Sequence, residues 1–453
     1  MRLPMTMKRP LLARLMAGAL VAGATLHGVP AQAIGLLAAY EAALKNDQNY
    51  RSAYYENEAA KENKVMGRAG LLPNVAYNYS GSRIHSDLGT FSNGRELPVQ
   101  HPEYFSRNSS ITLRQTLFNL DAVARYKQSI AQVDANASQF TGRTYEATLR
   151  VVSAYIDTVF AIDQRELAQA ARDTLAEQQK VNDRMFQKGE GTRTDMIETQ
   201  ARLDVAEAQL IEAQDNVNNA QASLAGLIGA EVGAIDPLAA DFALKPRDGR
   251  DVDAWLKLAQ EKNPEIRTQR QVVEIANQDV NKARAGHTPR IDLVGTYSKS
   301  SNETLQTVNQ DSTNRSVGVQ LSIPLYSGGA VNASMRQAVA NREKAKASLQ
   351  ASIDKTGVEV RKEYRLLASS AAKVEALVKM VSSNQLLIKA TEQSIKGGVR
   401  VNLDLLNAQQ QLFTAKRDLA QARYNYLLAG LRLKSAAGVV EYEDIRELAA
   451  YFH

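Results

Sequence analysis

The sequence predicts a mainly α-helical, elongated chain that carries a small β part and is built from two structural repeats. Three observations predict this fold class. A stretch containing Gly189 and Asp195 recurs 209 positions later, around Gly398 and Asp404. Two long segments contain no proline and almost no glycine, as long helices require. Two pairs of short β-prone runs occur, one of which alternates polar with apolar residues.

The first 33 residues have the composition of a secretory signal peptide. Four positive charges come before a mostly apolar segment from Leu15 to Val29, and Ala31 and Ala33 then form a small-residue cleavage site. We therefore expect an exported chain that begins at Ile34.

Export removes most of the net charge. The chain has 55 Lys and Arg against 49 Asp and Glu, a formal net charge of +6. The signal segment holds four positive residues and no acidic one, so the mature chain carries +2. This near-neutral balance argues against nucleic-acid binding. The chain has no cysteine, so we expect no disulfide and no lipid-modified N-terminal cysteine, which is compatible with the periplasm.

Residues 34–229 form the first predicted repeat. A helix over 34–70 comes before two strands, at about 74–82 and 109–117. Between Asn119 and Gln187 there is no proline and one glycine, so a helix roughly 100 Å long is permitted. A turn at about 188–195 then leads into a return helix that ends near Ile228.

Residues 230–253 contain two prolines and are the predicted linker. The second repeat, 254–438, follows the same order. It has a helix over 254–285, strands at about 290–298 and 315–323, a long helix over 329–396, a turn at about 396–404 and a return helix. Residues 439–453 are the predicted C-terminal equatorial segment.

The two return helices carry heptad stripes, which predict coiled-coil packing. Seam residues step by three and four from Met196 to Leu224, and again from Leu405 to Leu433. Alanine at nearly every second stripe position lets a partner helix approach closely. Each turn is therefore the tip of a helical hairpin. The glycines that break the helices there are Gly189, Gly191, Gly397 and Gly398.

Beyond the signal segment, the sequence holds no run of roughly 18 apolar residues that could form a membrane-spanning helix. A membrane crossing would therefore use the strands. In the run 317–323 the odd-numbered residues are apolar and the others are small or polar, so this strand has one apolar face. Four strands cannot enclose a lumen, and open sheet edges are not tolerated in a bilayer. We therefore expect several chains to contribute four strands each to one barrel.

The sequence offers no catalytic, cofactor-binding or metal-binding pattern. None of the five histidines has metal-ligand spacing, and no nucleotide-binding or serine-hydrolase motif lies in its proper context. His85 and His101 share one polar loop with Asp87 and Glu103, which we interpret as a solvated loop. We expect neither an enzyme nor a cofactor.

Three charged residues lie within a few positions of the two turns: Asp195, Arg400 and Asp404. Such charges usually cap helices and face water. They could instead take part in function. The residues alone leave both interpretations open.

Over essentially its whole mature length, the chain resembles the TolC family of outer-membrane channel-tunnel proteins. The most specific motifs are LSIPLYSGGAVN at 321–332, GVRVNLD at 398–404 and AQARYNYL at 420–427. The resemblance implies a homotrimer whose 12-stranded barrel lies in the lipid of the outer membrane and continues into a 12-helix periplasmic tunnel. It also implies two kinds of partner, a periplasmic adaptor and an inner-membrane pump of the ABC or proton-driven type.

The resemblance also gives the tip residues roles. In the family, the entrance is closed by links that involve the positions of Asp195 and Arg400. We call these two residues the gate latch. Asp404 matches an acidic ring that makes the entrance cation-selective. Two residues depart from the family pattern. Ile395 stands where a gate tyrosine is expected and Asn407 where a second ring aspartate is expected, so the latch should lose one hydrogen bond and the ring should be less acidic.

The sequence thus predicts the exit duct of a tripartite exporter in the outer membrane, passing either proteins by type I secretion or small molecules. The alternative is a soluble periplasmic coiled-coil adaptor, which has one helical hairpin beside a compact β domain. Two hairpins and two strand pairs favour the duct. The cargo, the pump and the adaptor stay open.

Overall fold

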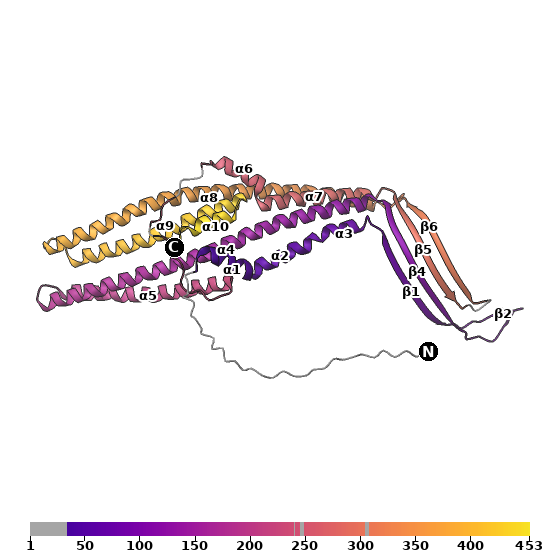
Figure 1. The fold of residues 1–453 in the computed structure, drawn as a ribbon, viewed down its shortest axis with the longest axis horizontal. Coiled ribbons are helices and arrows are strands. Elements are labelled where there is room, and N and C mark those ends of the chain that lie inside the picture. The colour runs from indigo at the N-terminus through magenta and orange to yellow at the C-terminus, as the bar shows by residue number, and fades with distance from the viewer. Residues whose placement is uncertain (1–33, 240, 245–248, 304–307) are drawn as a thin grey trace, which may run out of the picture.

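The computed structural model describes residues 34–239, 241–244, 249–303 and 308–453. The predicted signal peptide lies outside the described residues, as do positions 240 and 245–248 of the predicted linker and 304–307 of the second loop. The chain is one elongated body, with long helices side by side, a sheet at one end and two hairpin tips at the other (Figure 1). The predicted fold class is confirmed.

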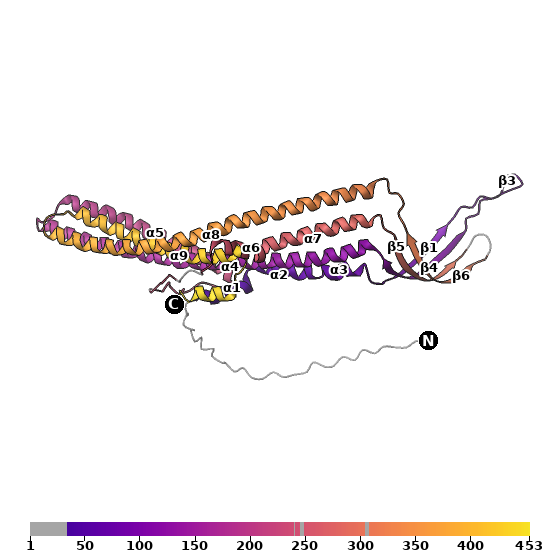
Figure 2. The same cartoon turned by 90° about the horizontal axis from the view of Figure 1, so that it is seen from above.

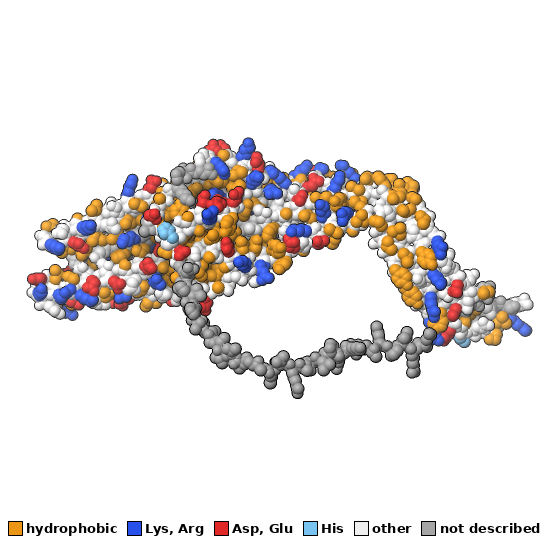
Figure 3. Space-filling view, viewed as in Figure 1, with side chains coloured by type: hydrophobic (Ala, Val, Ile, Leu, Met, Phe, Trp, Pro, Cys, Tyr) orange, Lys and Arg blue, Asp and Glu red, His pale blue; other side chains and the backbone are white. Residues whose placement is uncertain are grey.

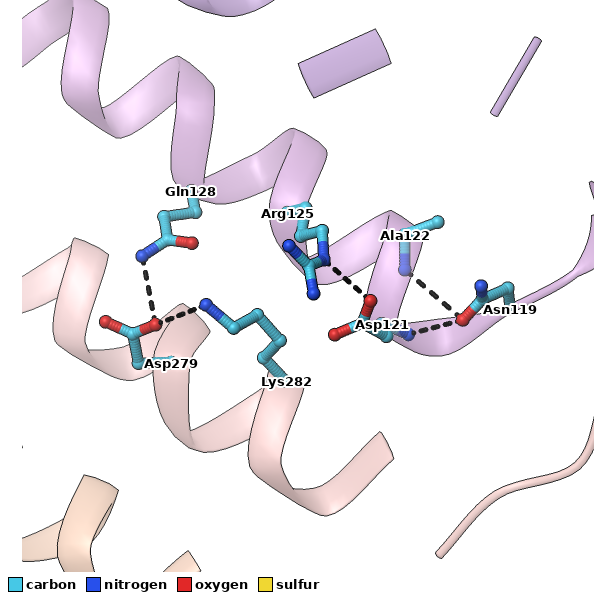
Figure 4. Close-up of polar contacts among 7 residues, drawn as sticks. All are labelled: Asn119, Asp121, Ala122, Arg125, Gln128, Asp279 and Lys282. Carbon is cyan, nitrogen blue, oxygen red and sulfur yellow. Dashed lines mark hydrogen bonds and ion pairs between the residues drawn. The ribbon is translucent and has the colours of Figure 1, made fainter. Parts of the chain in front are cut away.

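Two rods run along the molecule, α4 (Leu120–Gln187, 68 residues) and α8 (Ala330–Lys396, 67 residues). The α4 rod begins where the Asn119 side chain accepts hydrogen bonds from the amides of Asp121 and Ala122, at 3.0 and 3.3 Å (Figure 4). Two turns further on, Gln128 donates a hydrogen bond to Asp279 of α7 at 3.0 Å, which ties the rod to its neighbour (Figure 4).

The shorter helical segments are broken where the sequence predicted single helices. Residues 34–70 form α1 (Leu36–Asn46), α2 (Gln48–Lys61) and α3 (Asn63–Ala69), and residues 252–285 form α6 (Val252–Lys262) and α7 (Pro264–Ala285). Asp47 separates α1 from α2, because its carboxylate accepts the Asn49 amide at 2.9 Å and pairs with Arg150. Pro264 starts α7, since proline has no N–H to continue the helix before it.

The return helices α5 (Arg193–Ile228) and α9 (Asn402–Ala437) pack on α4 and α8 as hairpins (Figure 2). The heptad stripes face their partner helices. In α5 the buried stripe members are Thr199, Leu203, Ala206, Ala213, Val217 and Leu224, and in α9 they are Leu405, Ala408, Ala415, Leu419, Ala422, Ala429 and Leu433. No helix in the described ranges is long and apolar enough to span a membrane.

A four-stranded antiparallel sheet extends from the other end of the rods. Its order is β1 (Asn74–His85), β4 (Glu103–Phe118), β5 (Arg290–Asn302) and β6 (Gln310–Ser322). The two repeats therefore join where β4 pairs with β5, while β1 and β6 each keep one unpaired edge within the described chain. A short hairpin, β2 (Phe91–Ser92) and β3 (Arg95–Glu96), lies in the first loop.

The strands run further toward the loops than predicted. The second strand begins at Glu103 rather than near 109, and the fourth at Gln310 rather than near 315. These added ends consist mainly of serine, asparagine, threonine and charged residues, which lack the apolar alternation that identifies a strand in sequence. Backbone pairing nevertheless continues there, and the hydroxyls of Ser300 and Ser312 meet across the ladder at 2.7 Å.

The main hydrophobic core lies midway along the rods. There α1, α4, α9 and α10 (Tyr442–Ala449) surround fully buried side chains such as Tyr155, Leu431 and Ile445. The Tyr424 hydroxyl donates to the Asp163 carboxylate at 2.5 Å and so links α9 to α4. Burial raises the pKa of Asp163, although the Tyr424 hydrogen bond opposes this shift. The linker and the C-terminal segment meet at this level, where Leu238 pairs with Phe452.

Candidate functional site at the hairpin tips

The two tips share one backbone turn. Gly189 and Gly398 both adopt left-handed conformations, with φ of 76° and 73°. In each tip the residue after this glycine donates its amide five positions back, Glu190 to Met185 at 2.9 Å and Val399 to Ser394 at 3.0 Å. This is the helix-ending motif that glycine favours. Its recurrence explains why both turns carry glycine at the equivalent position.

The tips differ in how the next helix begins. Thr192 starts α5 with a capping box, in which its hydroxyl accepts the Asp195 amide at 3.2 Å and the Asp195 carboxylate accepts the Thr192 amide at 3.3 Å. The equivalent residue of the second tip is Val401, which has no side chain able to cap. Asp404, the counterpart of Asp195, therefore makes no capping box with it.

The predicted latch residues lie at different tips of the chain. Arg400 is exposed, at the position that corresponds to Gly191 of the first tip. The described part of one chain contains no ion pair between Asp195 and Arg400. The Asp195 carboxylate accepts both the Thr192 amide and the Thr192 hydroxyl through the same oxygen, Oδ2. The latch therefore stays a prediction. It would have to form between Asp195 of one chain and Arg400 of another, and Oδ1 of Asp195 could accept that contact. Gly397 follows α8 directly, and its amide donates to Gln393.

A polar network missed by the sequence analysis joins the two hairpins just above the tips. Thr199 of α5 is fully buried, and its hydroxyl accepts from Asn182 of α4 at 2.8 Å and from Asn402 of α9 at 3.3 Å. Gln178 of α4 donates to Asn402 at 3.0 Å and to Asn182 at 3.1 Å, which completes the ring. A threonine within an otherwise apolar heptad stripe was the available signal for this network.

Two further contacts hold the same junction. Arg202 of α5 donates to Asn407 of α9 at 2.8 Å, so the asparagine that replaces an expected ring aspartate bonds to the first hairpin. Leu406 is 1% exposed and packs against Leu175, Leu203 and Ala206. The α9 end of the second hairpin is thus seated on the first hairpin of the same chain, while Asp404 stays half-buried at its tip.

The described residues contain no cluster of three or more ligating side chains that could hold a metal ion. His85, at the end of β1, contacts the Glu103 carboxylate at 2.8 Å, and His101 in the first loop contacts the Asp87 carboxylate. These pairs lie at the loop end of the sheet, far from the hairpin tips (Figure 1).

Known proteins resemble this chain over most of its length. The alkaline protease secretion protein AprF of Pseudomonas aeruginosa is 40% identical over 93% of this chain and 88% of AprF. The proteases secretion protein PrtF of Dickeya chrysanthemi is 36% identical over 94% of this chain and 93% of PrtF. The CmeC outer membrane channel of Campylobacter jejuni has the same fold, with a TM-score of 0.76 at 19% identity over 92% of this chain and 90% of CmeC.

The profile of the family described as outer membrane efflux protein matches residues 39–230 and 255–439. The two matched ranges hold the two helix–strand–rod–hairpin units, and the segment between them, 231–254, nearly coincides with the predicted linker 230–253. The resemblance to the TolC family seen in the sequence is therefore confirmed. This chain belongs to the outer membrane efflux protein family.

Proposed function

We propose that this chain is the outer-membrane exit duct of a type I protein secretion system. The observation that carries the proposal is that two relatives above 30% identity are both named for protease secretion. These two relatives align with nearly the full length of the chain, which favours a duct over a soluble adaptor. The duct takes no cofactor and performs no catalysis. It works with a periplasmic adaptor and an inner-membrane ABC pump.

The proposed duct is a homotrimer in the outer membrane. The unpaired edges of β1 and β6 support this assembly, because three chains pairing edge to edge would give 12 strands without an open edge. The rods and return helices would then continue the barrel into the periplasm. Crosslinking in detergent is expected to give the mass of three chains, and a stable monomer with its full β content would contradict it.

Secretion by a reconstituted system tests the proposed cargo. We expect the chain, produced with a protease-secreting ABC pump and adaptor in a strain that lacks its own duct, to restore extracellular protease. The same strain should keep its sensitivity to small toxic compounds, because a type I duct serves a protein pump. Restored drug resistance without extracellular protease would assign the chain to small-molecule efflux instead.

Asp404 is the residue we propose for the acidic ring of the entrance. It lies in the first turn of α9, without the capping partner that Asp195 has. Three carboxylates around one constriction should raise the local concentration of cations by about tenfold or more. Asp404→Ala is therefore expected to weaken block by multivalent cations by at least about tenfold in planar bilayers.

Asp418→Ala is the matched control for this measurement. Asp418 is a half-buried aspartate of the same helix, four turns from the tip, and pairs with Arg417 at 3.0 Å. Its loss should leave the block unchanged. If Asp404→Ala and Asp418→Ala behave alike, Asp404 does not face the constriction.

A further inference from the structure

The strand register sorts the side chains of the sheet onto two faces. Residues directly opposite each other in a ladder share a face, and odd-numbered residues pair with odd-numbered residues throughout the three ladders up to the bulge near Phe118. The odd face carries an apolar band, which includes Val75, Tyr77, Ile111, Leu113, Val317 and Val319. The even face is mostly serine, asparagine and threonine. The sheet thus has one side suited to lipid and one suited to water.

A row of cations borders this apolar band on the same face. Each strand supplies one: Arg83 from β1, Arg107 from β4, Lys299 from β5 and Arg315 from β6. Between this row and the helices, the odd face of the strands carries no charged residue. Figure 3 shows apolar side chains covering the sheet next to the helices, with Lys and Arg side chains nearer its loop end.

Two arginines of the row lie over aromatic rings of the same face. The guanidinium of Arg107 lies 5.8 Å from the ring centre of Phe105, and that of Arg315 lies 5.6 Å from the ring centre of Tyr297. An aromatic face attracts a guanidinium electrostatically, and this contact does not use up the N–H donors of the arginine. The side chains are therefore held at the border of the band.

Only one of the four cations is neutralised within the described chain. Arg83 binds the Glu103 carboxylate through two nitrogens. Arg107, Lys299 and Arg315 are exposed and have no carboxylate partner among the described residues. Three unneutralised cations beside a lipid-facing band are complementary to a phosphate group attached to acyl chains. Arginine in particular binds phosphate oxygens through paired N–H groups.

We propose that Arg107, Lys299 and Arg315 bind the phosphate groups of a phosphorylated lipid in the outer leaflet, whose acyl chains lie along the apolar band. This inference rests on the proposed function, because it needs the sheet to lie in the outer membrane with its loops outward. The bound lipid would form part of the lipid-facing wall of the duct.

Lipid titration of the full chain in detergent tests this site. The probe is lipid A with two phosphates, compared with the same lipid after both phosphates have been removed. Wild type is expected to prefer the phosphorylated form. Each cation near a lipid surface contributes roughly fivefold to binding, so the triple variant R107Q/K299Q/R315Q should bind lipid A about 100-fold more weakly.

Arg114→Gln is the matched control. Arg114 is an exposed arginine of the same strand as Arg107, but its even number places it on the opposite face. This variant should bind lipid A as wild type does. The single variant Arg107→Gln, which should lose about fivefold, keeps the test decisive if the triple variant fails to fold.

Three results would overturn the inference. They are equal binding of lipid A and its dephosphorylated form, unchanged binding by Arg107→Gln, and full competition by inorganic phosphate alone, which would indicate a site for free phosphate. Membrane fractionation and channel conductance of the wild-type chain distinguish failure of the lipid-binding inference from failure of the proposed function. A chain that inserts and conducts, yet shows no phosphate preference, retains its function and lacks the site.

Discussion

Replacing Gly438 with alanine is expected to destabilise the chain by about 2–5 kcal/mol, because two separate costs add. Gly438 ends α9 in a left-handed conformation, with φ of 77°. A Cβ atom there would lie 2.5 Å from the carbonyl oxygen of Lys262 and 2.6 Å from Cα of Asn263. Both contacts are with the backbone at the α6–α7 junction, which a side-chain rotation cannot relieve.

Gly398→Ala is the matched control for this prediction. Gly398 has nearly the same backbone conformation, with φ of 73°, but no atom lies within 4 Å of its Cβ position. Only the left-handed penalty applies, about 1–2 kcal/mol. Unfolding of both variants in detergent measures the difference. Equal losses of stability in Gly438→Ala and Gly398→Ala would mean that the backbone of the α6–α7 junction moves aside and that the close contacts add no cost.

Replacing Arg400 with serine is expected to raise single-channel conductance while leaving thermal stability nearly unchanged. If three Asp195–Arg400 pairs close the entrance, each contributes about 0.2–1 kcal/mol, since such pairs are partly exposed. Three pairs then bias the closed state by roughly 3- to 150-fold. Adaptor contacts of similar size could overcome this bias. Because Ile395 cannot supply a hydroxyl, the wild-type entrance should itself be somewhat leaky.

Thr192→Ala separates the latch from helix capping. Thr192 completes the capping box with Asp195, so its loss should cost about 1 kcal/mol of stability and leave conductance unaltered. Arg400→Lys should stay close to wild type, because it keeps the charge. Conductance of Arg400→Ser equal to that of wild type would rule out the latch.

The architecture was predictable because its signals are local. The rods follow from the absence of proline and the scarcity of glycine, and the hairpins follow from glycines that precede heptad stripes. The breaks in the shorter helices were missed for different reasons. Pro264 was visible in the sequence and should have divided 254–285. Asp47 accepts the Asn49 amide as the N-cap of α2, and aspartate is a residue type that favours helix starts. Its pairing with Arg150, 103 positions away, could not be predicted from any local pattern.

The tip residues could be located from sequence, but their partners could not. The resemblance directed attention to Asp195, Arg400 and Asp404. The ring of Gln178, Asn182, Thr199 and Asn402 depends on how α9 sits on the first hairpin. That placement is a tertiary contact between segments about 200 residues apart, so it becomes visible only in the folded chain.

The pairing of β4 with β5 sets an order of events during folding. Ser106 and Asn302 meet across this ladder although 196 residues separate them, whereas Tyr77 and Ser109 of the first strand pair are 32 residues apart. Contacts so distant form late, because the chain between them must first be ordered. The helical hairpins can therefore form before the central ladder closes. The apolar face of the sheet is then completed last, which shortens the time during which the folding chain exposes it to aggregation.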